Sequence, residues 1–341
     1  MRAAIQRTTG SLNAVARRTA TRAGLAAALV MVAVLVGSQT ASAVIFHLKS
    51  GKAISYQPAP ASPIEPSGSA LAPKPYDAFF TNLDYNGGPV MPSNTNYALY
   101  WDPKGGPKYP SDYQSGLNRF FEDLAHDSGG HENVDSVATQ YNDYAGDFAG
   151  YSSHFGGALI DEDPYPANGC TRAPICLTDA QLRTELKKFV TGHALSTDLE
   201  HEYFLLTPEG VEDCFEASGS ECSANVTEAR FQTYCAYHGN IAIEGGGELI
   251  YASDPFVAGK NCDEPNHPNG SSDAELIGGL SHEHIESLTD PEPNNAWTDF
   301  GSSVGGEIGD KCRTFAESTE YGTPLGTAGN GAEYNQVING H

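Results

Sequence analysis

Basic residues are scarce in this 341-residue chain, which has 19 Lys and Arg against 43 Asp and Glu and a formal net charge of −24. Five of the basic residues, all Arg, lie within the first 43 positions. Without that segment, 14 basic residues face 43 acidic ones, a net charge of −29. Phosphate backbones and anionic membrane surfaces are bound mainly through Lys and Arg. The charge therefore argues against nucleic acid and membrane surfaces as partners.

Two common nucleotide-binding signatures are also missing. The sequence contains neither the phosphate-binding loop of nucleotide hydrolases nor the glycine-rich fingerprint of dinucleotide-binding domains. No internal repeat is evident either. The chemistry of the protein must therefore come from another kind of motif.

The first 43 residues have the features of a secretory signal peptide. Arginines precede an apolar run at residues 23–37, and the small residues Ala41 and Ala43 favour cleavage after Ala43. The run is too short for a comfortable membrane span. We therefore expect a secreted, extracellular protein with no membrane attachment after cleavage. A retained N-terminal anchor is the alternative.

The seven cysteines all lie after position 169, and no two have the C-x-x-C spacing of a zinc knuckle. In an exported protein, disulfides are the default state of such cysteines. Sequence spacing favours three pairs and leaves one cysteine over: Cys170 with Cys176, Cys214 with Cys222, Cys235 with Cys262, and Cys312 alone. Because spacing does not fix connectivity, other pairings stay open.

The chain after the leader divides into a short N-terminal part and one large domain. Residues 44–75 are expected to form a hairpin around Ser50 and Gly51, followed by a Pro/Ala/Ser-rich linker. Residues 76–341 are expected to form a single α/β domain with a mixed sheet, flanking helices and disulfide cross-links. Hydrophobic periodicity predicts strands at 96–101, 203–206 and 248–251, and helices at 112–126, 134–141, 178–195 and 275–288.

The most informative motif is Ser-His-Glu-His-Ile-Glu at residues 281–286. Positions four apart share one face of a helix, so His282 and Glu286 can hold one cation. Glu283 would then act as general base on a metal-activated water, as the Glu of HExxH hydrolases does. His284 lies two residues from His282 and is expected to project away from the metal.

Two acids further along the chain can complete the site. Catalytic zinc takes three protein ligands, and Glu307 is the candidate for the third, with Asp310 orienting a metal-bound imidazole. This arrangement is similar to the thermolysin-like gluzincins, and the similarity implies a zinc peptidase acting on a peptide or protein substrate. Glu286 departs from the gluzincin pattern, and two carboxylates with one imidazole make a harder site, in which Mn²⁺ or Ca²⁺ becomes conceivable.

A calcium-stabilised loop is the structural alternative. Its oxygen ligands would come from five acids: Asp290, Glu292, Asp299, Glu307 and Asp310. His238, close to Cys235, is a second candidate site residue, either as a substrate-binding group or as a proton donor. The alternative for His238 is a hydrogen-bonded histidine near a disulfide, with no role in catalysis.

Four segments together resemble the EXORDIUM, or phosphate-induced protein, family: NTNYALYWDP at 94–103, CAYHG at 235–239, HEHIESLTDP at 282–291 and EIGDKC at 307–312. The resemblance implies a secreted protein with a cell-wall or other extracellular partner, and it supports a non-catalytic binding or signalling protein as the alternative to a hydrolase. Plant members have Asn-Pro where this chain has Asp290 and Pro291. Members also run on past residues 334–341 to a further cysteine, which would explain the unpaired Cys312 by a truncated C-terminus.

Overall fold

A computed structural model describes residues 44–59, 82–130, 134–150, 152–224, 226–259, 262–263, 267, 269–299, 306–310, 326–327 and 333–334. All of these residues belong to one compact unit, Thr40–His341. The expected leader, most of the Pro/Ala/Ser-rich linker and Cys312 lie outside the described residues. Within the described part, no helix has both the length and the apolar character that a membrane crossing requires.

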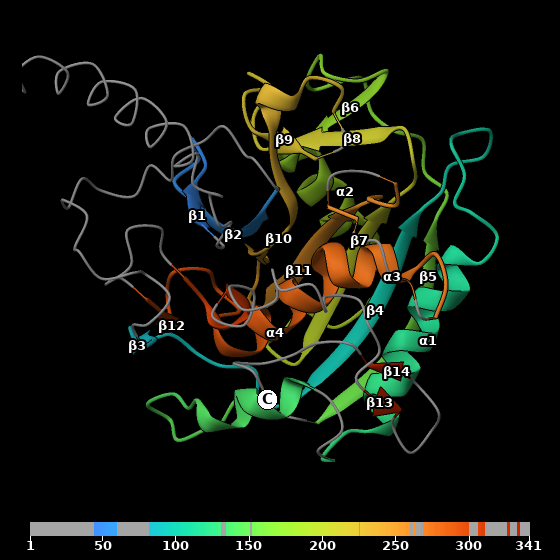
Figure 1. Cartoon of the computed structure of the whole chain (residues 1–341). Coiled ribbons are helices and arrows are strands. Elements are labelled where there is room, and N and C mark those ends of the chain that lie inside the picture. Colours follow the sequence, from blue (N-terminus) through green and yellow to red (C-terminus); the bar gives the residue numbers. More distant parts are fainter. Residues whose placement is uncertain are drawn as a thin grey trace, which may run out of the picture. The chain divides into compact units, whose positions relative to one another are not determined.

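Ten strands form one mixed sheet, which confirms the expected α/β fold class (Figure 1). Eight of them lie in the order β5 (Ser153–Asp161), β4 (Asn94–Trp101), β7 (His201–Thr207), β11 (Glu248–Pro255), β10 (Gln232–Ala242), β9 (Cys222–Ser223), β8 (Val211–Cys214) and β6 (Ile175–Thr178). Neighbours from β5 to β11 are parallel, whereas β10 runs antiparallel to β11.

The predicted N-terminal hairpin belongs to this same sheet. Its strands are β1 (Val44–His47) and β2 (Ala53–Pro58), and β2 pairs antiparallel with β10. Two further pairs of short strands lie apart from the main sheet: β3 (Asp84–Tyr85) with β12 (Trp297–Thr298), and β13 (Gly326–Thr327) with β14 (Glu333–Tyr334). Strand β2 of the hairpin also brings a backbone N–H, that of Gln57, to the candidate functional site.

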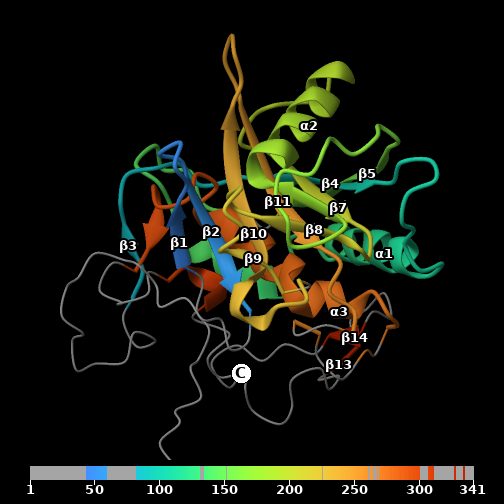
Figure 2. The same ribbon diagram turned by 90° about the horizontal axis from the view of Figure 1, so that it is seen from above.

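Both faces of the central strands are covered, and alternate residues of each strand belong to different cores. On β4, Leu99 belongs to the core that includes α2 (Asp179–Gly192), and Tyr100 belongs to the core that includes α1 (Tyr113–His126). Figure 2 shows α2 on one side of the sheet and α1 on the other. Side chains of a strand point alternately to its two faces. A residue therefore packs on the α1 side or the α2 side according to whether its position along the strand is odd or even.

Three of the predicted helices form with adjusted bounds. Helix α1 matches the prediction for 112–126, whereas α2 ends at Gly192, because Ala194 takes a left-handed backbone conformation with φ of 54°. The helix predicted at 134–141 is a 3₁₀ helix, η2 (Val134–Gln140), with the tighter winding that short segments use. A second 3₁₀ turn, η3 (Ala229–Phe231), precedes β10.

The three predicted disulfides are confirmed: Cys170–Cys176, Cys214–Cys222 and Cys235–Cys262. The first two close loops at the β6, β8 and β9 end of the sheet. The third ties β10 to the segment that leads into the motif helix. These cysteines are oxidised, so their sulfur atoms are not thiolate ligands for a metal.

Candidate metal centre

The motif helix runs from Asp273 to Thr289 and changes its winding partway. It begins with the short α3 (Asp273–Glu275), continues through one π-helical turn, η4 (Leu276–Leu280), and ends with α4 (Ser281–Thr289). The hydroxyl of Ser281 donates to the carbonyl of Leu276 at 2.7 Å and so bonds to the wide turn. Helix is confirmed where the 275–288 prediction placed it, but the π turn was not predicted. Such turns are frequent at functional sites.

Strand β10 packs directly against this helix. A Cβ atom at Gly279 would overlap the Cβ of Ala236 on β10, so glycine is needed for the close approach. Tyr237 belongs to the core on the α2 side, so its neighbours along the strand face α4. His238 therefore points at the motif helix, where it is fully buried.

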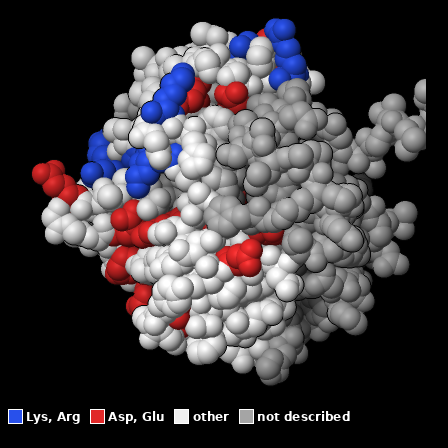
Figure 3. Space-filling view, turned by 90° about the vertical axis from the view of Figure 1, so that its left-hand side faces the viewer, with Lys and Arg blue, Asp and Glu red and all other residues white. Residues whose placement is uncertain are grey.

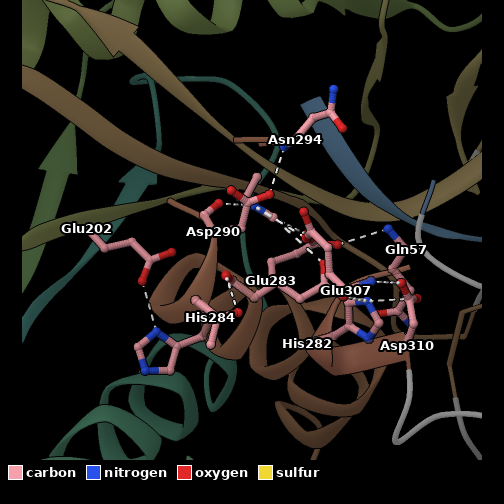
Figure 4. Close-up of polar contacts among 12 residues, drawn as sticks. Gln57, Glu202, His282, Glu283, His284, Asp290, Asn294, Glu307 and Asp310 are labelled. Carbon is pink, nitrogen blue, oxygen red and sulfur yellow. Dashed lines mark hydrogen bonds and ion pairs between the residues drawn. The ribbon is translucent and has the colours of Figure 1, made fainter. Parts of the chain in front are cut away.

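Six residues meet at this junction, and we call them the acid–histidine centre: His238, His282, Glu283, Glu286, Glu307 and Asp310. Figure 4 shows His282, Glu283, Glu307 and Asp310 gathered on one side of α4. The least buried member is His282, whose exposed fraction is 8%. The centre is thus almost entirely enclosed by protein.

The first group of donors surrounds the imidazole of His282. Its Nε2 atom lies 2.9 Å from Oε1 of Glu286 and 3.7 Å from Oδ1 of Asp310. One donor atom from each of the three residues lies within 4.8 Å of the other two. The helical spacing of His282 and Glu286 therefore produces the shared face that the sequence predicted.

The second group of donors surrounds the imidazole of His238. Its Nε2 atom lies 3.8 Å from Oε2 of Glu307, and its Nδ1 atom lies 3.9 Å from Oε2 of Glu286. One donor atom from each of these residues again lies within 4.8 Å of the other two. Glu286 therefore belongs to both groups.

The loop of Glu307 and Asp310 is held in place by its own contacts. The backbone N–H of Glu307 donates to Oδ2 of Asp310 at 2.7 Å. Between them, Gly309 lies so close to α4 that a Cβ atom there would be 2.9 Å from both Oε1 of Glu286 and Nδ1 of His282. Only glycine lets this loop approach the helix without displacing the donors.

The acids of the centre carry carboxylate oxygens that accept no hydrogen bond. Both side-chain oxygens of Glu286 and both of Glu307 are buried and form no hydrogen bond of regular geometry with the described residues, although the backbone N–H of Asp310 faces Glu286 and the carboxyl group of Asp290 faces Glu307. No Lys or Arg of the described part forms an ion pair with either carboxylate. Burying an unpaired carboxylate costs several kcal/mol, so a group of them requires either protons or a cation.

This crowding is reflected in the pKa values. Burial raises the pKa of Glu286 to about 7. Burial, followed by the negative charges of Glu286 and Asp290, raises the pKa of Glu307 well above its ordinary value. Burial, followed by the charge of Glu286, does the same to the pKa of Glu283. A divalent cation would reverse these shifts by favouring the ionised carboxylates.

Glu283 has different neighbours from those expected of a free general base. Its Oε1 atom accepts the backbone N–H of Gln57, on β2, at 2.9 Å, and its Oε2 atom lies 3.0 Å from Nδ1 of His238. A carboxylate that accepts from one imidazole nitrogen fixes the tautomer and leaves the other nitrogen free to bind a metal. In this structure Glu283 is placed to orient His238.

His284 lies on another side of the helix, as expected, and faces a different set of acids (Figure 4). Its Nδ1 atom lies 2.8 Å from Oε2 of Glu202, and its Nε2 atom lies 3.3 Å from Oδ2 of Asp135. Burial lowers the pKa of His284, but the charges of Asp135 and Glu202 outweigh burial and raise that pKa to about 10. His284 thus ties α4 to β7 and η2 as a buried ion pair.

Two acids of the alternative calcium loop, Asp290 and Glu292, have hydrogen-bond donors of their own. Both side-chain oxygens of Asp290 accept backbone N–H groups, from Asn294, Asn295 and Ala296, at 2.6–3.1 Å. Glu292 accepts the side-chain amide of Asn295 at 2.7 Å. Glu307 and Asp310 instead face the two imidazoles. Asp290 therefore organises its own loop.

A third group of acids differs from the other two because a lysine lies beside it. Asp161, Asp163 and Glu185 also bring donor atoms within 4.8 Å of one another. There, Nζ of Lys188 lies 2.5 Å from Oδ2 of Asp163 and 2.8 Å from Oε1 of Glu185. The face in Figure 3 likewise shows basic side chains near some of its acidic ones. In this surface acid group Asp161 is buried but Asp163 and Glu185 are partly exposed, and Lys188 supplies a positive charge that Glu286 and Glu307 do not have.

The donor spacing suits a divalent cation. Ligand atoms about 2.1 Å from one ion, at angles of roughly 90–110°, are ~3.0–3.4 Å apart. In the first group, Nε2 of His282 lies 2.9 and 3.7 Å from its two acids, within a small side-chain adjustment of that range. In the second group, Nε2 of His238 lies 3.8 Å from Glu307, and the donor atoms of all three residues lie within 4.8 Å of one another. Imidazole with carboxylate suits Zn²⁺ and Mn²⁺, and a site richer in oxygen shifts preference toward harder ions.

The sequence-based expectation grouped His282, Glu286 and Glu307 as ligands and placed Asp310 behind an imidazole. In the structure, Asp310 lies with His282 and Glu286, whereas Glu307 lies with His238 and Glu286. The pairing of His238 with Glu283 was not foreseen, because it joins a strand to a helix far along the chain. The sequence carries one signal for this pairing: His238 follows the core residue Tyr237 and so points to the opposite face of its strand.

Comparison of the sequence with protein-family models, with curated proteins and with solved structures finds no match. The function of the chain is therefore inferred from the chemistry of the centre itself.

Proposed function

We propose that the protein is a secreted metal-dependent hydrolase that uses metal-activated water at the acid–histidine centre. The observation that carries the proposal is the burial of four carboxylate oxygens, from Glu286 and Glu307, without a hydrogen bond of regular geometry to the described residues. A divalent cation supplies the positive charge that these oxygens lack and gives the buried imidazoles a common partner.

The primary cation site in this proposal consists of His282, Glu286 and Asp310. The first two come from one face of α4, and the third comes from the loop that Gly309 brings against that helix. A cation bound by three protein ligands lowers the pKa of a coordinated water and polarises a carbonyl oxygen. Zinc is the expected ion, with Mn²⁺ and Ca²⁺ as the harder alternatives.

Glu283 is the proposed acceptor of the water's proton. Its contact with His238 gives it a second effect, because a change at Glu283 would also release the His238 ring. The two effects are separable: loss of a base removes turnover and leaves the metal bound, whereas loss of a positioning group also weakens metal binding. The proposed role of His238 is to face the metal, and it is not proposed as a proton donor.

A peptide or protein is the proposed substrate, by analogy with the gluzincins that the His282–Asp310 segment resembles. Secretion is proposed from the arginine-rich leader and is supported by the three disulfides, which persist in oxidising compartments. An extracellular partner is proposed from the resemblance of four segments to the EXORDIUM family.

The test is hydrolysis of a denatured, fluorophore-labelled protein by the zinc-loaded and the manganese-loaded chain. We expect wild type to cleave it and Glu286→Gln, which removes a ligand charge, to lose both metal and turnover. Glu283→Gln should reduce turnover by about 10²–10⁴-fold with the ion at His282, Glu286 and Asp310 retained. Asp163→Asn, in the surface acid group, is the matched control and should behave as wild type. Equal hydrolysis by Glu286→Gln and wild type would rule the mechanism out.

A structural ion in a non-catalytic extracellular protein is the second candidate, and the enclosure of the centre favours it. No donor residue has an exposed fraction above 8%, which leaves little room for a polypeptide substrate. This candidate predicts metal bound at near-stoichiometric levels, a large fall in thermal stability on chelation and no hydrolysis by any variant. The hydrolase predicts the first two of these results and hydrolysis as well.

A further inference from the structure

The carboxylate of Glu286 faces two imidazoles at once. Its Oε1 atom lies 2.9 Å from Nε2 of His282, and its Oε2 atom lies 3.9 Å from Nδ1 of His238. Neither oxygen accepts a hydrogen bond in the described part of the chain. A carboxylate with its two oxygens directed at different donor groups has the layout of a bridging ligand.

The group around His238 forms a cation site of its own. The Nδ1 atom of His238 faces Oε2 of Glu283 at 3.0 Å. With a cation in the centre, Glu283 is ionised and can only accept, so Nδ1 then carries the proton. The Nε2 atom then presents a lone pair. It lies 3.2 Å from the carbonyl oxygen of Asp290 and 3.8 Å from Oε2 of Glu307, which also present lone pairs.

Three electron-pair donors that face one another at these distances repel unless a proton on Nε2 or a cation lies among them. Glu307 is 1% exposed and neither of its carboxylate oxygens forms a hydrogen bond of regular geometry with the described residues. The oxygens of Glu286 likewise form no such hydrogen bond with the described residues, and Glu286 completes the group because its donor atom lies within 4.8 Å of those of His238 and Glu307. These are unpartnered buried acceptors directed into a site that also holds an imidazole.

We propose that the centre is dinuclear, with one divalent cation held by His282, Glu286 and Asp310, a second held by His238, Glu286 and Glu307, and Glu286 as the bridge. The carbonyl of Asp290 is a further oxygen ligand for the second ion. Because its ligands are mostly oxygen, the second position suits Mn²⁺ or Zn²⁺ and disfavours softer ions. Two-metal hydrolytic sites place their ions about 3.5–4 Å apart, a separation that one bridging carboxylate can span.

This inference rests on the proposed function in one respect, that the centre binds a cation at all. Its rival is a doubly protonated His238, whose Nε2–H would donate to Asp290 and whose charge would balance Glu283 without a second ion. The two alternatives differ in stoichiometry: the dinuclear centre binds two ions per chain, and the rival binds one.

The test is titration of chelator-treated protein with Mn²⁺, followed by calorimetry and electron paramagnetic resonance. We expect two ions per chain in wild type and an exchange-coupled signal in place of the six-line spectrum of isolated Mn²⁺. His238→Gln and Asp310→Asn should each bind one ion and show the isolated spectrum. Asp163→Asn, at the surface acid group, should still bind two. Circular dichroism identifies any variant that has failed to fold.

The wild-type measurement alone can overturn the proposal, so it does not depend on the folding of any variant. One ion with an isolated spectrum in wild type, kept in His238→Gln and lost in Asp310→Asn, would leave the hydrolase proposal standing and refute the second site. Two ions in wild type with one lost in Asp163→Asn would place the second ion at the surface and refute it as well. No bound ion would refute both proposals together.

Discussion

The Oε2 atom of Glu283 lies 3.0 Å from Nδ1 of His238, although 45 residues separate the two along the chain. The contact joins the motif helix α4 to strand β10, and the backbone N–H of Gln57 on β2 holds the other oxygen of the same carboxylate. One acid thus connects three elements of the fold at the side of the helix that carries the acid–histidine centre. The orientation of His238 is therefore set by the same residue that the motif marks as a general base.

Gly309→Ala should weaken metal binding with little effect on the rest of the fold. The added Cβ would lie 2.9 Å from Oε1 of Glu286 and Nδ1 of His282, so the loop or the donors must move. We expect a roughly tenfold rise in the dissociation constant, about 1.4 kcal/mol, measured by calorimetric titration. Gly192→Ala is the control, because a Cβ there meets nothing within 4 Å. Unchanged affinity in Gly309→Ala would show that the loop does not set the donor geometry.

Removal of the Cys235–Cys262 disulfide should cost more stability than removal of either other disulfide. It spans 27 positions, against 6 and 8 for the other two, and a longer loop restricts the unfolded chain more. The chain-entropy model gives about 3.5 kcal/mol for this loop and ~2–2.5 kcal/mol for the shorter ones. Urea unfolding of the three double Cys→Ser variants measures the order. Equal losses would contradict the loop-length argument.

The buried His284 should make the protein less stable as the pH rises above neutrality. Its pKa is raised from 6.5 to about 10 in the folded state, so the folded chain holds a proton there that the unfolded chain has lost. The stabilisation is complete below pH 6.5 and disappears as the pH rises through 10.

Between these limits, the slope of unfolding free energy against pH should approach about −1.4 kcal/mol per pH unit for this one group. Urea unfolding at a series of pH values measures it, and His284→Gln should remove that part of the slope. A wild-type curve with the same slope as the variant curve would mean that Glu202 and Asp135 do not hold a proton on this ring.

Much of the fold could be predicted from the sequence because its signals are local. The aromatic, β-prone run at residues 96–101 predicted β4, and the periodic Leu and Phe residues of 178–195 predicted α2. Close spacing along the chain also favoured the three disulfide pairs that form. In each case the residues that decide the structure are near neighbours, so periodicity and spacing report on them directly.

Strand β10 could not be predicted in the same way. It is buried along nearly its whole length, with apolar and polar residues intermixed, because both of its faces are covered. Such a strand shows no clean alternation of apolar and polar positions. The partner of His238 therefore depends on strand order and register, which only the assembled sheet determines.

The candidate site likewise has one part that depends on residues close in sequence and one part that depends on the assembled fold. The helical spacing of His282 and Glu286 is local, and their donor atoms meet as the motif predicts. Which of Glu307 and Asp310 joins which imidazole depends on a loop whose course is set by Gly309 and by the N–H of Glu307. A sequence motif identifies the candidate donor residues, but the packing of the loop determines which imidazole each acid faces.

The most direct measurement of the central claim is thermal unfolding of chelator-treated wild type and Glu286→Gln, with and without added Zn²⁺ or Mn²⁺. A folded-state ion site stabilises the protein by about 2.7 kcal/mol at a free-ion concentration 100 times the dissociation constant. We predict that the ion raises the melting temperature of wild type by roughly 5 °C or more and leaves that of Glu286→Gln unchanged. Wild type that melts at the same temperature with and without either ion would contradict a metal centre at Glu286.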